Sequence, residues 1–245
     1  MTTQVQRTPR GLHVRVVSLF SRSFFGFVET IIRNLTGPIG DCLRYYYWRC
    51  RMRHVGSSVT FGVGLRIANP QFISIGDNTH IDDGVTLLAG PPNASRTYHS
   101  RRANHGIPVE EGVLAIGCGS HVCSDALLQA HGGMNVGNYV GVASGARLYS
   151  LSHHYRDISG RAPTTVMFKF SNRSPEGEQA LISSPVVLQD NSAVGTNSVV
   201  LPGVTIGAGA WVGALSLVVK DVPDRMLALG VPATVIKELE AGECE

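Results

Sequence analysis

Residues 188–218 read LQDNSAVGTNSVVLPGVTIGAGAWVGALSLV, and an aliphatic residue recurs at every sixth position of this stretch. The recurring residues are Leu188, Val194, Val200, Ile206, Val212 and Val218. The position four residues after each of them holds serine or alanine in four cases and valine in two. A repeat at a fixed short period indicates one structural unit stacked several times.

The same rhythm occurs earlier in the chain, in three groups of three aliphatic residues. The groups are Ile75, Ile81 and Leu87; Ile116, Val122 and Leu128; and Val136, Val142 and Leu148. Within each group the step is six residues, and a glycine follows the first member. Between the second and third groups the rhythm slips by two residues, near Gly132 and Gly133. The repeat therefore extends well beyond the quoted stretch.

A six-residue period excludes both a single helix and a single long strand. A helix turns every 3.6 residues, and the side chains of a strand alternate every two. The period fits a short strand, a corner and another short strand, and three such strands close a triangular coil. Stacked coils form parallel strands about 4.8 Å apart. We therefore predict a mainly β fold, in which the six aliphatic residues of 188–218 line the interior of two stacked coils.

The predicted coil domain covers residues 56–223. Its rhythm is interrupted at 90–112 and at 155–183, and we interpret both segments as loops that leave the coil. Loops of this length in a compact domain are often functional. The tail, residues 224–245, is predicted to contain a short closing helix over 235–240.

The first 55 residues form a basic segment with a helical pattern. They contain nine arginines against Glu29 and Asp41, so their net charge is +7 in a chain whose total is +3. The aromatic run YYYW at 45–48 and the basic charge are typical of contact with an anionic membrane surface. The alternative is that these helices pack on the coil or between subunits.

The composition describes a folded chain, with 43% hydrophobic residues and 28 glycines. The five cysteines fit no zinc pattern, so we expect free thiols in a reducing cytoplasm and no bound metal. No stretch of about 18 apolar residues lacks a charge, so we expect no transmembrane helix. The basic N-terminus is not followed by a compact apolar core and a small-residue cleavage site, so we expect no cleaved signal peptide. No nucleic-acid partner is expected.

Three motifs near the C-terminal end accompany the repeated Ile-Gly pairs: LPGVTIG at 201–207, VVKDVP at 218–223 and GVPA at 230–233. Over roughly residues 60–240 the chain resembles the hexapeptide-repeat acyltransferases, and within them the sugar and polysaccharide O-acetyltransferases. The resemblance implies a left-handed parallel β-helix, a homotrimer, and acetyl-coenzyme A bound between neighbouring subunits. The sequence departs from the family at Ala193, where an aromatic residue is frequent.

Acyl transfer from a thioester needs a base that takes the proton of the acceptor, and histidine suits this role. His153 and His154 lie where the rhythm stops and the second loop begins, and the resemblance implies a catalytic histidine at this place. The family pattern matches His153 better. His154 is the alternative, because adjacent residues of a strand point to opposite sides. His131, before Gly132, is the next candidate.

Five residues are candidates for binding the coenzyme. Lys220 is one of three lysines beside 18 arginines, and its compact charge suits a phosphate. The resemblance implies that the pantetheine arm lies against the backbone at small residues of the coil. These residues are Gly195, Gly213, Ala214 and Ser216. The alternative is that small residues stand there because the corners need them.

The predicted activity is acetyl-coenzyme-A-dependent O-acetylation of a small carbohydrate, a sugar or polysaccharide precursor, in the cytoplasm or at the inner face of the membrane. Two alternatives stay open: N-acetylation of an amino sugar or an antibiotic, and a non-catalytic β-helix scaffold. A γ-class carbonic anhydrase shares the coil but expects two zinc-binding histidines five positions apart. No pair of histidines in this sequence has that spacing.

Overall fold

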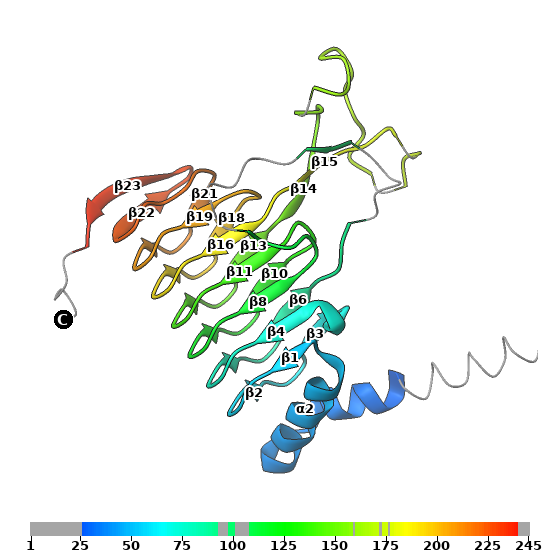
Figure 1. Cartoon of the computed structure of the whole chain (residues 1–245), viewed down its shortest axis with the longest axis vertical. Coiled ribbons are helices and arrows are strands. Elements are labelled where there is room, and N and C mark those ends of the chain that lie inside the picture. The colour runs from blue at the N-terminus through cyan, green and yellow to red at the C-terminus, as the bar shows by residue number, and fades with distance from the viewer. Residues whose placement is uncertain are drawn as a thin grey trace, which may run out of the picture.

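The structure is a computed structural model that describes residues 26–92, 98–100, 108–158, 160–171, 173–175 and 177–239. Within these residues the chain passes in turn along three walls of parallel strands, which we call sheets A, B and C (Figure 1). The mainly β fold predicted from the period is confirmed.

The strands of each wall are short and stacked in register. Sheet A contains β1 (His54–Val55), β4 (Ile73–Ile75), β8 (Leu114–Ile116), β11 (Met134–Val136), β16 (Val186–Leu188) and β19 (Thr205–Ile206). Sheet B contains β2 (Thr60–Phe61), β5 (His80–Ile81), β9 (His121–Val122), β12 (Gly141–Val142), β17 (Ala193–Val194), β20 (Trp211–Val212), β22 (Met226–Gly230) and β23 (Ala233–Glu238). Sheet C contains β3 (Arg66–Ala68), β6 (Thr86–Leu88), β10 (Leu127–Gln129), β13 (Arg147–Tyr149), β18 (Val199–Val200) and β21 (Leu217–Val218). Each turn of the coil takes one strand from A, then B, then C.

The interior of the coil is the column of aliphatic side chains that the period predicts. None of the six recurring residues of 188–218 is more than 1% exposed. They stack in pairs on successive turns, with Leu188 beside Ile206, Val194 beside Val212 and Val200 beside Val218. The residues of the three earlier groups are at most 3% exposed. The prediction of two stacked coils over 188–218 is therefore confirmed.

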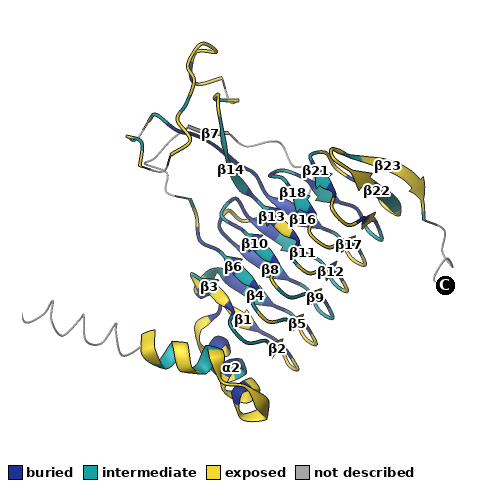
Figure 2. Ribbon diagram, turned by 180° about the vertical axis from the view of Figure 1, so that it is seen from behind, coloured by how far each residue is buried: buried dark blue, intermediate teal, exposed yellow. Residues whose placement is uncertain are grey.

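The helices of the basic segment close one end of this core. Residues 26–34 are helical, and α2 (Gly37–Arg51) follows them against the first turn of the coil (Figure 2). Trp48, in the aromatic run, is 1% exposed and belongs to the core cluster, whereas Tyr46 is 58% exposed. The buried Arg44 donates from Nε to the carbonyl oxygen of Phe61 at 2.7 Å. Among the described residues no helix is long and apolar enough to cross a bilayer.

The tail differs from its prediction. Residues 233–238 form the strand β23, antiparallel to β22, so the short helix predicted over 235–240 is wrong for the residues that the structure describes. The physical reason is twofold. Thr234, Val235 and Ile236 are β-branched and favour a strand. The last parallel strand of sheet B also leaves an unpaired edge, which β23 covers with backbone hydrogen bonds.

The two interruptions of the rhythm meet outside the coil. A small sheet contains β14 (Leu151–His154), β15 (Ala180–Ser183) and β7 (Tyr98–Ser100), in the order β14-β15-β7. It therefore joins the first loop to both ends of the second (Figure 1). The sequence predicted 180–183 as part of a loop, and this segment is a strand. Its partners lie far away in the sequence, so no local pattern could indicate the pairing.

Candidate active site

The histidine pair lies where the chain leaves the fourth turn of the coil. Strand β14 follows β13 of sheet C after the single residue Ser150, and it carries His153 and His154 at its far end. These two residues are opposite Leu181 and Ala180 of the antiparallel strand β15. The pair therefore stands at the base of the second loop, between its outgoing and returning strands.

Hydrogen bonds of the buried Ser150 fix the point where the second loop leaves the coil. The Ser150 hydroxyl donates to the carbonyl oxygen of Gln129 at 2.6 Å and accepts from the backbone N–H of Gly132 at 2.9 Å. The carbonyl oxygen of Ser150 accepts from the N–H of Ser184 at 2.9 Å. One buried serine thus ties the exit of the second loop to the turn below it and to the end of the same loop.

The first loop is attached to the same place. The Ser183 hydroxyl donates to Oε1 of Glu111 at 2.8 Å, and Glu111 lies at the end of the first loop. His131, the further candidate base, donates from Nδ1 to the carbonyl oxygen of Gly90 at 2.8 Å, where the first loop begins. Both loops therefore leave the coil at the corner between sheets C and A, which we call the C–A corner. At this corner the imidazole of His131 fastens a loop.

The two histidines have different surroundings. The His153 ring lies 4.7 Å from the Phe170 ring of the second loop. The His154 ring stacks on Tyr155 at 4.6 Å, and its Nδ1 lies 2.7 Å from the carbonyl oxygen of Arg156. The backbone N–H of Arg156 lies 3.1 Å from the same Nδ1. If Nδ1–H donates to the carbonyl, Nε2 keeps the lone pair that a base needs, whereas an Nδ1 that accepts from this N–H leaves the proton on Nε2. Both side chains are partly exposed, so both are accessible to a substrate.

Four of the candidate coenzyme residues gather at the opposite corner of sheet C, between sheets B and C. Gly195 and Gly213 lie on successive turns, and a Cβ at Gly195 would be only 2.5 Å from the N atom of Ala214. A Cβ at Gly213 would meet the side chain of Leu229 at 1.8 Å. The buried Ser216 hydroxyl accepts from the N–H of Gly230 at 3.1 Å, whereas Ala214 is exposed. Close contact with backbone atoms thus requires glycine at 195, whereas the contact at 213 is with a leucine side chain that can move.

Lys220 is exposed and follows β21 at the C–A corner. Strands β13 and β21 are two steps apart in sheet C, so the exits to His153 and Lys220 differ by about 10 Å along the coil axis. Candidate residues therefore lie at both corners that border sheet C. The histidines and Lys220 lie along one corner, and the small residues lie along the other.

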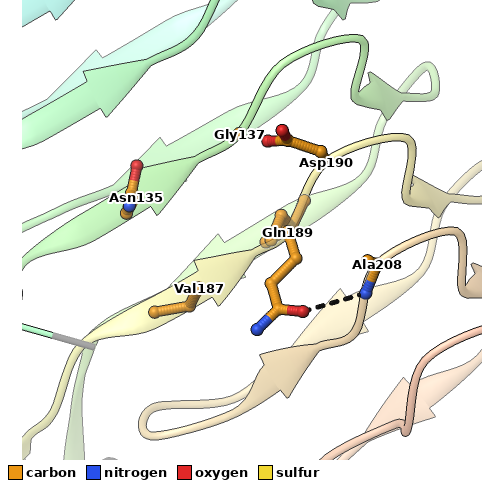
Figure 3. Close-up of a pocket in the computed structure, with 7 residues that line it drawn as sticks. Asn135, Gly137, Val187, Gln189, Asp190 and Ala208 are labelled. Atoms are coloured by element: carbon orange, nitrogen blue, oxygen red, sulfur yellow. Dashed lines mark hydrogen bonds between the residues drawn. The ribbon is translucent and has the colours of Figure 1, made fainter. Parts of the chain in front are cut away.

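A groove among the described residues lies elsewhere, on the outer face of sheet A (Figure 3). Its volume is about 330 Å³, and its lining includes Asn135, Val187, Asp190 and Gln189, whose Oε1 accepts from the N–H of Ala208 at 3.0 Å. None of the residues predicted for catalysis or coenzyme binding lines it. The groove is open, and no histidine lines it.

Sequence reasoning did not single out two features of the site. Ser150 was unremarkable in the sequence, although the two-residue slip at Gly132 marks the turn to which it is bonded. Trp211 is 54% exposed and lies in register with Ala193, one turn further along the outer face of sheet B. An aromatic residue thus stands beside the position where the resembling family often has one.

No family model matches the chain. Among curated proteins it is 47% identical over 58 residues to the 2,3,4,5-tetrahydropyridine-2,6-dicarboxylate N-acetyltransferase of Enterococcus faecalis, covering 24% of this chain and 25% of that enzyme. It is 42% identical over 59 residues to the galactoside O-acetyltransferase of Escherichia coli, covering 24% and 29%. The match thus spans about a quarter of each relative's length.

Solved structures match over most of the chain. One is AntD, an N-acyltransferase from Bacillus cereus, as a variant in complex with dTDP and coenzyme A. Its TM-score is 0.60 at 25% identity, over 80% of this chain and 88% of that one. Another AntD structure contains dTDP-4-amino-4,6-dideoxyglucose and coenzyme A, with the same score and identity. The predicted likeness to the hexapeptide-repeat acyltransferases is confirmed by these relatives, which are all acyltransferases.

Proposed function

We propose that this chain is an acetyl-coenzyme-A-dependent acetyltransferase that acts directly on a hydroxyl of a sugar or polysaccharide precursor. The observation that carries the proposal is the position of His153 and His154 at the C–A corner, where the coil opens into two joined loops. The coenzyme A complexes of AntD support coenzyme A as the co-substrate. In this proposal the coil is a left-handed parallel β-helix, and a trimer places the coenzyme between neighbouring subunits.

In the proposed reaction, His153 acts as the general base. Its imidazole takes the proton of the acceptor hydroxyl while the hydroxyl oxygen attacks the thioester carbonyl carbon. The carbon–sulfur bond then breaks, the acetyl ester remains on the acceptor, and coenzyme A leaves as its thiol with the proton that the imidazole returns. A positioned base contributes about 10²- to 10⁴-fold to such a reaction. His154, with Nδ1 held by the carbonyl of Arg156, is the alternative base.

The coenzyme is proposed to run along the outer face of sheet C. Lys220 would contact a phosphate, as its exposure and compact charge permit. Gly195, Gly213, Ala214 and Ser216 would offer a flat corner of backbone to the pantetheine arm. Gly195 is partly exposed and Ala214 is exposed, which supports their part of this assignment, whereas Gly213 and Ser216 are buried.

The proposal is tested by exchanging the two histidines separately. His153→Ala should lower kcat by about 10²- to 10⁴-fold and leave the affinity for acetyl-coenzyme A nearly unchanged. His154→Ala should cost less, and His54→Ala, on the exposed side of β1, is the matched control. If only His154→Ala abolishes turnover, His154 is the base. If both variants stay fully active, the base lies elsewhere. If the wild type binds no acetyl-coenzyme A, the alternative of a non-catalytic β-helix scaffold is favoured.

A second candidate function is N-acetylation of an amino sugar. AntD is an N-acyltransferase that matches 81% of this chain in its complex with an amino-sugar nucleotide. The two functions are separated by offering pairs of sugars that differ in one hydroxyl or amino group. An O-acetyl ester is released by mild alkali, whereas an N-acetyl amide survives it. Turnover of the amino member alone would replace the first candidate by the second.

We also propose a homotrimer in the cytoplasm whose N-terminal helices contact the inner face of the membrane. Phe27, Ile31 and Ile39 on these helices are 64%, 48% and 72% exposed. Apolar side chains beside arginines suit an anionic lipid surface. Sedimentation equilibrium tests the trimer. Flotation with anionic vesicles tests the membrane contact. If the protein is a trimer but does not float with the vesicles, these helices are assigned to packing between subunits.

A further inference from the structure

Two histidines from different turns meet on the outer face of sheet B. His80 in β5 and His121 in β9 are direct neighbours in register, although 40 residues separate them in the sequence. Ile81 and Val122, the next residue of each strand, point into the core, so the two imidazoles point outward. Asp82 follows Ile81 and also points outward, toward both rings.

The three side chains converge on one point. Nε2 of His80 lies 2.9 Å from Oδ1 of Asp82, and Nε2 of His121 lies 3.0 Å from the same oxygen atom. The two rings are perpendicular, with centroids 5.1 Å apart. All three ligand-type atoms lie within 4.8 Å of one another. The His80 and His121 side chains are 55% and 51% exposed, so an ion from solvent can reach them.

Neighbouring side chains orient this cluster. Nδ1 of His80 is hydrogen-bonded to Thr60 Oγ1 on the preceding turn. When Nδ1–H donates to that hydroxyl, Nε2 holds a lone pair directed at the cluster. Ser124 Oγ lies 3.5 Å from Oδ2 of Asp82, the carboxylate oxygen that the two rings do not contact at Nε2. Partners of this kind fix the tautomer and the direction of metal ligands.

We propose that His80, Asp82 and His121 form a surface site for a divalent transition-metal ion, such as Zn²⁺. Two imidazole nitrogens and one carboxylate oxygen suit these borderline ions, whereas Mg²⁺ and Ca²⁺ prefer oxygen ligands. Bond lengths of about 2.0–2.1 Å at tetrahedral angles require ligand atoms roughly 3.3 Å apart. The two nitrogen–oxygen distances therefore need to open by only a few tenths of an ångström. The ion would link the second and third turns of the coil, which the first loop separates in the sequence.

Calorimetry with Zn²⁺ on the full chain, after treatment with a chelator, tests the site. The single variants His80→Ala, His121→Ala and Asp82→Asn should each weaken the cluster's binding by at least about 10- to 100-fold. His54→Ala, a surface histidine outside the cluster, should bind as the wild type does. Co²⁺ provides a second readout, because its visible absorption reports nitrogen and oxygen ligands and does not depend on activity. Metal-free melting curves check that each variant is folded.

The expected result is one Zn²⁺ per chain that each ligand variant loses and the control keeps. The proposal is overturned if the wild type binds no more tightly than Asp82→Asn, or if the three variants keep the wild-type affinity. The second outcome would assign the bound ion to other residues. It would leave Asp82 as an ordinary ion-pair partner of two surface histidines.

Discussion

Exchanging Gly132 for alanine tests whether the base of the second loop is as tightly built as the structure shows. A Cβ at this position would lie 2.3 Å from the carbonyl oxygen of Ser150 and 2.8 Å from the N atom of Ser184. Both are backbone atoms, so neither can rotate away. The φ angle of Gly132 lies outside the left-handed region, so the added methyl group is the whole perturbation.

The size of the effect follows from these distances. Ordinary contact begins near 3.4 Å, so the oxygen atom of Ser150 must withdraw by about 1 Å. A forced methyl group of this kind costs about 1–3 kcal/mol, and the stiffer unfolded chain offsets about 0.4–1 kcal/mol. We therefore expect a loss of about 1–2 kcal/mol, or a fall in Tm of about 2–8 °C. Strand β14 begins directly after Ser150, so a shift of this size should also displace His153. A misplacement of about 1 Å can cost about 10²-fold in rate.

Gly141→Ala is the matched control. A Cβ there would meet only the Cβ of Ala193, at 3.9 Å, and its φ is also outside the left-handed region. Its stability should stay the same or rise by about 0.4–1 kcal/mol. Thermal melts and acetyl-coenzyme A turnover of both variants complete the test. A Gly132→Ala variant that melts and turns over like Gly141→Ala would refute the close contact at Ser150 and its role in placing the histidines.

Three further changes test the core, the capped end and the coenzyme site. Val200→Asp buries a carboxylate in the aliphatic column and should unfold the domain, so a soluble variant with a wild-type melting curve would contradict the inward position. Arg44→Ala removes the donor to the buried carbonyl of Phe61 and should cost about 1–3 kcal/mol in urea denaturation, whereas the exposed Arg49→Ala should be neutral. Lys220→Ala should weaken the binding of acetyl-coenzyme A by about 1.5–3 kcal/mol, as measured by calorimetry. It should not change the binding of a coenzyme fragment that lacks the phosphates. Equal affinities would remove this lysine from the site.

The interior of the coil could be predicted because the inward position of each wall recurs every six residues and is filled by an aliphatic side chain. The start of the coil was predicted too late, because the predicted domain begins at residue 56 whereas strand β1 begins at His54, inside the predicted helical segment. The inward position of the first turn in sheet B also holds the aromatic Phe61 in place of an aliphatic residue. The aromatic run was interpreted as a candidate for membrane contact, yet Trp48 belongs to the core. A packed helix and a lipid-facing helix present the same apolar pattern, so composition alone does not separate them.

What the sequence did not predict is where distant segments meet. Strands β7 and β15 pair only because the coil brings the second and fourth turns to the same corner, and no local signal encodes that pairing. The same holds for His80 and His121, which the stacking of turns places side by side. Sequence spacing finds ligands that share one helix or hairpin, and it fails when a parallel register supplies the second ligand.

The coil also explains why the candidate catalytic histidines lie outside its regular part. The inward positions are occupied by packing, so a polar catalytic group there would be buried without partners. Apart from β22 and β23 at one end, the outer walls are made of strands of two or three residues, which hold side chains in rows but build no deep cleft. A corner is different, because the chain can leave it and return without disturbing the stack, as it does between Ser150 and Ser184. Insertions at one corner on two turns therefore assemble a site from loops, while the repeat supplies only a rigid base. On this argument, changes in the two loops should alter the acceptor that is chosen, and changes at the inward positions of the coil should alter stability alone.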